Sequence, residues 1–345
     1  MTLDSSTAAG TPPETCDSDS AATAATQTLS PAAEALVRWF DQHRTVFVAF
    51  SGGVDSSVVL AAALRSSAQR CKAATTTAPG NSISVTAVTA RSPSVAQWQL
   101  QTAATVAQEL GATQQVIDTD ELALPAYAAN DSRRCFHCKT TLYRSLHQLV
   151  DAVTAQTRQT AEPQTDAITI VSGTNADDLG DYRPGIAAGD EAGVQTPLAD
   201  LGIGKAAVRD IARQFGLSNA ELPAAPCLAS RIAYGVQVTP ERLTRIEQAE
   251  DYLRSLGLSE LRVRLHPGEL ARIEIPLDQI DRLLCDQTRK QLSGRLIQLG
   301  FQYVTLDLQG LSSGSMNRPL VSLQLPDPIT ANPPQHDSTK PGKAT

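Results

Sequence analysis

The sequence SGGVDSS at residues 51–57 constrains the fold more than any other part of the chain. It directly follows the apolar run 45–50, which predicts a buried strand, and leads into residues 56–65, which predict a helix. Two glycines let the backbone approach a ligand closely, and the first N–H groups of the helix point toward it. The motif lacks the GK[ST] ending of a P-loop. We therefore predict a pyrophosphate site, with a turn that has no function as the alternative.

The next segments alternate between predicted strands and helices. We expect strands at 82–88, 114–118 and 167–173, and helices at 94–110, 139–150 and 205–215. Strand and helix in repetition predict a doubly wound parallel sheet, which is an α/β fold.

The pattern changes after about residue 226. A helix is expected from Thr239-Pro240 to Leu256, and strands are expected at 261–265, 271–275 and 302–308. These elements predict a second, smaller α+β domain. The expected organisation is a disordered tail at 1–30, the parallel-sheet domain at 31–226, the small α+β domain at 227–322 and a disordered tail at 323–345.

Charge and composition exclude several classes of protein. The 29 Lys and Arg residues against 36 Asp and Glu give a net charge of −7, which disfavours nucleic acid as a partner but allows small anionic ligands. No stretch approaches the roughly 20 apolar residues of a membrane span, and residues 1–30 lack a secretory pattern, so we expect a cytoplasmic protein. Six cysteines are too sparse for a disulfide scaffold.

A second polar segment, SGTNADDLGDYRPG at 172–185, also follows a predicted strand. It holds Asn175, Asp177, Asp178 and Asp181 beside Arg183. Carboxylates beside a nucleotide loop can hold magnesium, and an arginine can bind phosphate through two hydrogen bonds. A solvated acidic loop is the alternative.

SGGVDSS resembles the PP-loop of the ATP pyrophosphatases, which have an adenine nucleotide alpha hydrolase-like fold and cleave ATP between its α- and β-phosphates. Together with RCFHCK, GTNADDLGDYRPG, PAAPCLASRI and RVRLH in this order, it resembles the ATP-dependent sacrificial sulfur transferases, the LarE family, over about residues 31–320. This family acts in nickel-pincer cofactor biosynthesis for lactate racemase. The resemblance implies that ATP adenylates a carboxylate of pyridinium-3,5-biscarboxylic acid mononucleotide, and that sulfur then displaces AMP to leave a thiocarboxylate.

The resemblance implies ATP and Mg²⁺ as cofactors. Asp55 would act in catalysis by helping to position Mg²⁺, although an aspartate that only caps a helix is the alternative. The residues expected to bind ATP are Ser51, Gly52, Gly53, Val54, Asp55, Ser56, Ser57, Thr174, Asp177 and Arg183.

Three cysteines carry the expected sulfur chemistry. Cys227 lies in PAAPCLASR, where the preceding proline favours an extended loop and Arg231 could lower the thiol pKa; the family has its reactive sulfur here. Cys135 and Cys138 form a CxxC pair that alone fits zinc, a redox pair or an iron–sulfur site. Family members without this pair donate the sulfur of the single cysteine, whereas members with all three bind a [4Fe-4S] cluster. We therefore predict a cluster on all three cysteines, with Cys227 as a sacrificial donor as the alternative.

The expected substrate residues lie mostly in the second domain. Arg262 and Arg264 are two residues apart on a strand, so both face one side and could hold the substrate's phosphate. Glu250 and Glu274 could line the same pocket or pair with these arginines. Trp98 could cover the pyridinium ring or pack in the core, and core packing is favoured.

The competing hypotheses are a PP-loop tRNA thiolase, which needs a broad basic surface, and a non-catalytic metal or iron–sulfur carrier. The resemblance further implies a homo-oligomer, with a hexamer as the expected form, and partners among the other nickel-pincer cofactor biosynthesis proteins.

Overall fold

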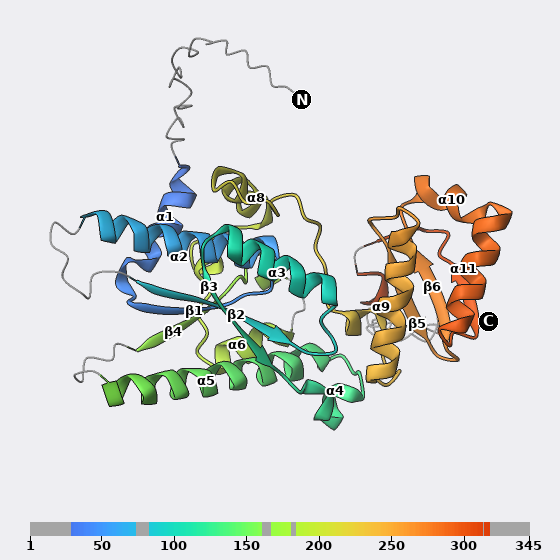
Figure 1. The fold of residues 1–345 in the computed structure, drawn as a ribbon, viewed down its shortest axis with the longest axis horizontal. Helices are drawn as coiled ribbons and strands as arrows, with labels where there is room; N and C mark the ends of the chain where they lie inside the picture. Colours follow the sequence, from blue (N-terminus) through green and yellow to red (C-terminus); the bar gives the residue numbers. More distant parts are fainter. Residues whose placement is uncertain (1–28, 74–82, 161–166, 181–183, 313, 318–345) are drawn as a thin grey trace, which may run out of the picture.

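The computed structural model describes residues 29–73, 83–160, 167–180, 184–312 and 314–317. The disorder predicted for the two tails falls almost wholly outside these ranges. Within them, two separate sheets are each accompanied by helices (Figure 1). No helix in this part of the chain is both long and apolar enough to span a membrane.

The first sheet has four parallel strands in the order β3-β2-β1-β4. Its strands are β1 (Thr45–Ala49), β2 (Ser84–Arg91), β3 (Thr113–Asp118) and β4 (Ile168–Ser172). Its helices are α1 (Pro31–Trp39), α2 (Val54–Ala73), α3 (Gln97–Glu109), α4 (Pro125–Ala128), α5 (Arg134–Thr160), α6 (Pro184–Glu191), α7 (Pro197–Asp200) and α8 (Lys205–Gln214). This architecture confirms the predicted doubly wound α/β fold.

Alternate side chains of β1 pack on opposite faces of the sheet, which gives three layers. Val46 and Val48 lie in a core with α1, α2, α3 and α8, whereas Phe47 packs with Tyr143 and Leu146 of α5 on the other face. Figure 1 shows the same division, with α5 and α6 on one side and the other four helices opposite. The central strand is therefore buried on both faces, which explains its continuous apolar sequence.

The second sheet has three strands in the order β5-β6-β7. Strands β5 (Arg262–His266) and β6 (Leu270–Glu274) are antiparallel, and β7 (Tyr303–Leu306) runs parallel to β6. Helices α9 (Pro240–Ser255), α10 (Ile280–Leu284) and α11 (Asp286–Gln298) pack against it. Short 3-10 helices occur at η1 (Phe40–Gln42), η2 (Glu121–Ala123), η3 (Ala176–Gly180), η4 (Leu228–Arg231), η5 (Leu277–Gln279) and η6 (Ser315–Asn317).

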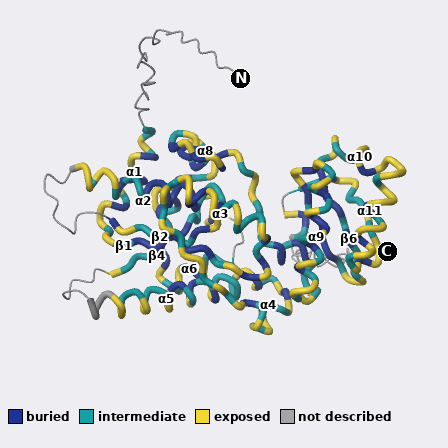
Figure 2. The backbone as a smooth tube through the Cα atoms, viewed as in Figure 1, coloured by how far each residue is buried: buried dark blue, intermediate teal, exposed yellow. Residues whose placement is uncertain are grey.

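The apolar core of the second sheet extends into the first part of the chain. Ala96 and Tyr127 are buried in the same cluster as Leu228, Leu243 and other residues of the second region. Figure 2 shows buried backbone in both regions, including along α9 and β6. The boundary predicted at 226/227 remains a prediction, because side chains from before it contribute to the core that follows it.

Helix α5 begins earlier and ends later than the sequence predicts. The expected helix covered residues 139–150, but α5 runs from Arg134 to Thr160. The Asp131 side chain accepts a hydrogen bond from the Arg133 N–H (2.8 Å), so it satisfies a free donor just before the helix. As a result, Cys135 and Cys138 lie in the first turns of a helix instead of a loop.

Candidate active site

The PP-loop connects the end of β1 to the start of α2, and its serines hold it in shape. Ser56 Oγ donates to the Gly53 carbonyl and lies 3.2 Å from Ser51 Oγ, while Ser57 Oγ donates to the same carbonyl (both donated bonds 3.0 Å). Ser51 is exposed, whereas Ser56 and Ser57 are buried. The buried hydroxyls therefore shape the loop, and the exposed side of the loop remains free for phosphate.

Two glycines allow close packing around this loop. Gly52 has φ +74°, and a Cβ there would lie 2.6 Å from the Cα of Ala103 in α3. A Cβ on Gly173, after β4, would lie 2.7 Å from the Ser56 backbone nitrogen. No side chain fits at either position, so α3 and the loop after β4 contact the PP-loop through backbone.

The segment after β4 places polar side chains beside Asp55. Asn175 Nδ2 donates to Asp55 Oδ1 (2.9 Å), and Lys205 Nζ lies 3.3 Å from Asp178 Oδ1. Burial is the main cause that raises the pKa of Asp55; the nearby Asp178 raises it further, and the Asn175 hydrogen bond and Lys205 oppose the shift. A buried carboxylate near a second one is stabilised by a cation, and Mg²⁺ needs only one or two protein carboxylates alongside phosphate oxygens. Asp55 and Asp178 therefore fit a magnesium site.

Lys205 is a candidate phosphate ligand that the sequence analysis missed. Lys205 is the first residue of α8 and comes 27 positions after Asp178 in the sequence. Its ammonium group lies beside the Asp178 carboxylate, which neighbours Asp55. A lysine at the start of a predicted helix gives no signal of its own, because only the fold places α8 beside the PP-loop.

The other predicted ATP residues of this segment have different positions. Thr174 Oγ1 lies 3.1 Å from Ser172 Oγ at the end of β4. Asp177 is exposed, and its carboxylate accepts a hydrogen bond from the Lys205 backbone N–H (2.7 Å) at the start of α8. Arg183 lies outside the described residues.

The fold brings the CxxC helix and Cys227 together from distant parts of the sequence. Cys138 and Cys227 are both half-buried against the second core, whereas Cys135 is exposed. Burial, followed by the neighbouring Cys227 and Glu121, raises the pKa of Cys138 to about 12, and Lys139 opposes this shift. Among the described residues, no three His, Cys, Asp or Glu side chains form a group that could hold a metal ion. The thiols of Cys138 and Cys227 thus lie near each other, but the described arrangement of the cysteines does not support a [4Fe-4S] site.

Arg262 and Arg264 lie on one face of β5, as predicted. Arg264 is buried and donates to Glu274 Oε2 (3.0 Å) and to Ser315 Oγ (3.2 Å). Arg262 instead donates to the backbone carbonyls of Leu261 and Ala224 (2.7 and 3.0 Å). Within the described part of the chain, Arg262 has no carboxylate partner, so it is the arginine available to a ligand anion.

Glu250 and Glu274 are fully buried and each pairs with an arginine, but only Glu274 pairs with one of the two arginines that the sequence analysis considered. Glu250 accepts from Arg231 Nε (3.0 Å), and Glu274 accepts from Arg264. Arg231 also donates to the backbone carbonyl of Cys227 (3.1 Å). Burial, followed by the positive charge of Arg231, lowers the pKa of Arg262 to about 10. Repulsion among these cations favours a bound anion.

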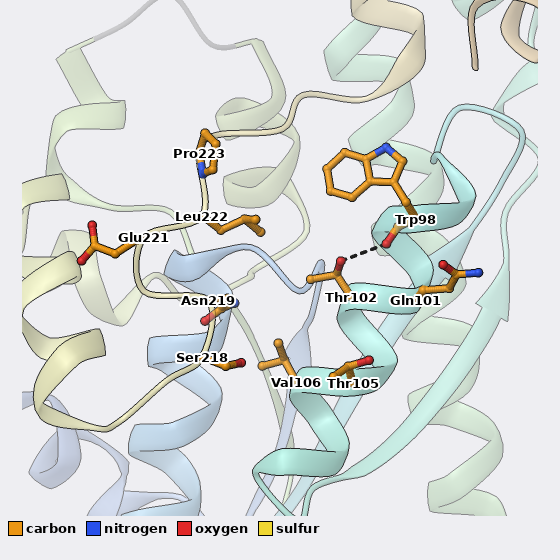
Figure 3. Close-up of a pocket in the computed structure, with 10 residues that line it drawn as sticks. All are labelled: Trp98, Gln101, Thr102, Thr105, Val106, Ser218, Asn219, Glu221, Leu222 and Pro223. Atoms are coloured by element: carbon orange, nitrogen blue, oxygen red, sulfur yellow. Dashed lines mark hydrogen bonds between the residues drawn. The ribbon is translucent and has the colours of Figure 1, made fainter. Parts of the chain in front are cut away.

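Trp98 lies at the start of α3, half-buried, at one end of a cavity of about 560 Å³ (Figure 3). The guanidinium of Arg254 from α9 lies 5.2 Å from its ring centroid, a cation–π contact. The cavity is lined by Trp98, Gln101, Thr102, Thr105, Val106, Ser218, Asn219, Glu221, Leu222 and Pro223. The half-buried indole also packs against the apolar core of the second sheet, in line with the favoured alternative of core packing.

A parallel sheet that carries an SGGVDSS loop at the carboxyl end of its central strand defines a PP-loop nucleotide-binding domain. In agreement, residues 44–123 match the family described as tRNA methyl transferase HUP domain. The chain is 33% identical over 300 residues to pyridinium-3,5-bisthiocarboxylic acid mononucleotide synthase from Lactiplantibacillus plantarum, covering 86% of this chain and 98% of that protein. The chain therefore belongs to the LarE family of ATP-dependent sulfur transferases, which confirms the predicted family and enzyme class.

Two uncharacterized proteins are also similar along most of their length. The chain is 39% identical over 287 residues to one from Synechocystis sp., covering 83% of this chain and 97% of that protein. It is 25% identical over 268 residues to one from Methanocaldococcus jannaschii, covering 78% of this chain and 91% of that protein.

Proposed function

We propose that this protein makes pyridinium-3,5-bisthiocarboxylic acid mononucleotide for nickel-pincer cofactor biosynthesis. ATP adenylates a carboxylate of pyridinium-3,5-biscarboxylic acid mononucleotide and releases pyrophosphate; sulfur then attacks the acyl carbon and AMP leaves, and a second ATP and a second sulfur convert the other carboxylate in the same way. The observation that carries this proposal is the similarity to the Lactiplantibacillus plantarum synthase over 98% of that protein's length. The PP-loop geometry supports the ATP half of the reaction independently.

Adenylation needs the β- and γ-phosphates to be held while the substrate carboxylate attacks the α-phosphorus. The N–H groups at the start of α2 face that position with the positive end of the helix dipole. Asp55 and Asp178 would hold Mg²⁺, which would neutralise the phosphates and so aid departure of pyrophosphate. Lys205, whose Nζ lies 3.3 Å from Asp178 Oδ1, is proposed to bind a phosphate oxygen.

The substrate's own phosphate is assigned to the arginine face of β5. Arg262 carries the only proposed direct contact, because Arg264 is already hydrogen-bonded to Glu274 and Ser315. The loop from α8 to Cys227 connects α3 to β5. Gln99 Nε2 of α3 donates to the Ala225 carbonyl, and Arg262 Nη2 of β5 donates to the neighbouring Ala224 carbonyl. A substrate bound at Arg262 would therefore lie beside the loop segment that leads to Cys227.

The sulfur site is proposed to comprise Cys227 with Cys135 and Cys138. The three-cysteine sequence favours a [4Fe-4S] cluster on these thiols, which would supply an iron that can carry an additional sulfide. The alternative is that Cys227 gives up its own sulfur. The described positions of the thiols give the cluster no support, and either route needs Cys227 close to the activated carboxylate.

The test is a pyrophosphate-release assay with ATP, Mg²⁺ and the dicarboxylate mononucleotide, followed by mass spectrometry of the product. We expect pyrophosphate, AMP and the thiocarboxylate. Formation of ADP and phosphate would contradict the PP-loop assignment. Equal pyrophosphate release with nicotinic acid mononucleotide, which has one carboxylate, would contradict the proposed substrate.

A further inference from the structure

A buried asparagine connects the turn before α5 to the segment that follows Cys227. Asn130 is fully buried and has φ +58°, a conformation that asparagine tolerates better than most residues. Its Nδ2 donates to the carbonyls of Ala233 and Val236 (both 2.8 Å). Its own carbonyl accepts from the Gly235 N–H (3.1 Å). One residue therefore joins two segments about a hundred positions apart in the sequence.

A buried arginine next to Cys135 completes the connection. Arg134 Nη1 donates to Asn130 Oδ1 (2.5 Å) and to the carbonyl of Ala229 (2.8 Å). Arg134 is 5% exposed, and within the described ranges no carboxylate pairs with it. Burying a cation with only neutral acceptors has a large desolvation cost, so stability alone does not account for this choice of residue.

The far end of this connection is a rigid turn that begins at Cys227. The Ser230 side chain and backbone N–H both donate to the Cys227 carbonyl (2.7 and 3.0 Å), and Leu228 N–H donates to the Ser94 carbonyl (2.8 Å). Ala229, which Arg134 contacts, lies inside this turn. A displacement of Arg134 would therefore move the Ala229 carbonyl and, through the hydrogen bonds within this turn, Cys227.

We propose that Asn130 and Arg134 form a clamp that positions Cys227 against Cys135 and Cys138. The clamp joins the first residue of the CxxC helix to the Cys227 turn, so the three thiols keep a fixed relation while substrate and nucleotide exchange. This inference rests on the proposed sulfur-transfer function. Both residues are positioning residues, and neither contacts the reacting atoms.

Two variants and one control test the clamp. Asn130→Asp keeps the side-chain shape but removes the Nδ2 donors, and Arg134→Gln removes the guanidinium that reaches Ala229. Arg133→Gln is the matched control, because Arg133 is the adjacent exposed arginine and its guanidinium lies over the Phe136 ring (4.9 Å).

The first readout is chemical and needs no substrate. In a chain whose Cys16, Cys71, Cys135 and Cys285 are replaced by serine, dibromobimane becomes fluorescent when it joins Cys138 to Cys227. We expect both clamp variants to lower the crosslinking rate by about tenfold, since such reactions depend strongly on geometry, and the control to leave it unchanged. An unchanged rate in both folded variants would overturn the clamp.

The second readout, with native cysteines, separates the two half-reactions. The clamp variants should slow thiocarboxylate formation by about 100-fold while pyrophosphate release stays within about twofold of the unsubstituted protein. A parallel fall of both activities, or failure of both variants to fold, would show a general structural role instead and reject the clamp. If the unsubstituted protein releases pyrophosphate but forms no thiocarboxylate, the proposed function fails while the crosslinking rate still tests the clamp.

Discussion

Asn175 donates a hydrogen bond to the Asp55 carboxylate (2.9 Å) across a sequence separation of 120 residues. The two side chains come from the loops that follow β4 and β1, which are neighbouring strands of one parallel sheet. Polar residues after adjacent strands meet at the carboxyl edge of such a sheet, where ligands bind. The acidic segment and the PP-loop therefore meet at the edge of the sheet where we propose that the nucleotide binds.

Replacing Asp55 by asparagine should separate activity from stability. Asp55→Asn keeps an acceptor for Asn175 but removes the charge proposed to hold Mg²⁺, so pyrophosphate release should be lost. Burial raises the pKa of Asp55 above its usual value, so the ionised carboxylate disfavours the folded state at neutral pH.

In the absence of nucleotide, Asp55→Asn should therefore unfold at a higher temperature than the unsubstituted protein at pH 7. This gain should develop as pH rises from about 4, the ordinary carboxyl range, to the raised pKa, stay constant above it, and vanish below about pH 4, where the Asp55 carboxyl is neutral. Thermal unfolding across this pH range measures it. Full pyrophosphate release by the variant would contradict the magnesium role.

Alanine substitutions at two adjacent glycines should have opposite structural results. Gly52→Ala places a Cβ against the Ala103 backbone at φ +74°, so we expect it to lower the free energy of unfolding by more than about 1 kcal/mol. At Gly53 a Cβ would meet only Ser51 Oγ at 3.4 Å, so Gly53→Ala should fold normally. Urea unfolding compares the two. Equal stability would mean that α3 can move away from the loop at little cost.

Arg262→Ala should weaken substrate binding by about 1.5–3 kcal/mol, the loss expected for a hydrogen bond to a charged group, with little change in ATP affinity. Because the pKa of Arg262 is lowered to about 10, substrate affinity should also fall as pH rises through that value. Isothermal titration calorimetry with each ligand measures both effects. Equal weakening of substrate and ATP would place Arg262 outside the substrate site.

Arg264→Ala should act mainly on folding. It removes a donor from the fully buried Glu274, which keeps Arg272 and Ser315 as partners (2.9 and 2.8 Å). An unsatisfied buried acceptor costs about 1–3 kcal/mol, so the free energy of unfolding should fall by that amount. Arg264→Ala with unchanged stability would show that Arg272 and Ser315 compensate fully.

The two sulfur routes predict opposite outcomes for the CxxC pair. With a [4Fe-4S] cluster, protein purified without oxygen should contain iron and sulfide. Alanine at any one of Cys135, Cys138 or Cys227 should then abolish both the brown colour of the cluster and sulfur transfer. With the sacrificial route, Cys135→Ala and Cys138→Ala should stay active, and Cys227 should lose about 34 Da once, as hydrogen sulfide. Intact mass and metal analysis after turnover distinguish them.

The sequence predicts the elements of the sheets well, because buried parallel strands leave continuous apolar runs such as 45–50, and glycines mark helix ends. The start of α5 was missed for a physical reason. Residues 134–138 have no helical apolar spacing, and their helix is stabilised by contacts with a turn that follows residue 226.

Candidate site residues that belong to a motif could be predicted from the sequence, whereas those without a motif could not. Ser51 to Ser57 form a recognisable loop, but the roles that we propose for Lys205 and Asn130 depend on partners that only the fold supplies. The roles of Glu250 and Glu274 were left open by the sequence for the same reason, since the pairing of a buried carboxylate depends on which arginine the packing brings to it.

The contact of Gly173 with the start of α2 restricts how this site can change during evolution. Because a Cβ there would meet the Ser56 nitrogen at 2.7 Å, even the smallest side chain would displace the helix that faces the phosphates. Gly173 cannot gain a side chain unless the start of α2 retreats in the same lineage. Change at Gly173 must therefore proceed through paired substitutions, whereas Gly53 in the neighbouring PP-loop has room for a methyl group and can vary alone.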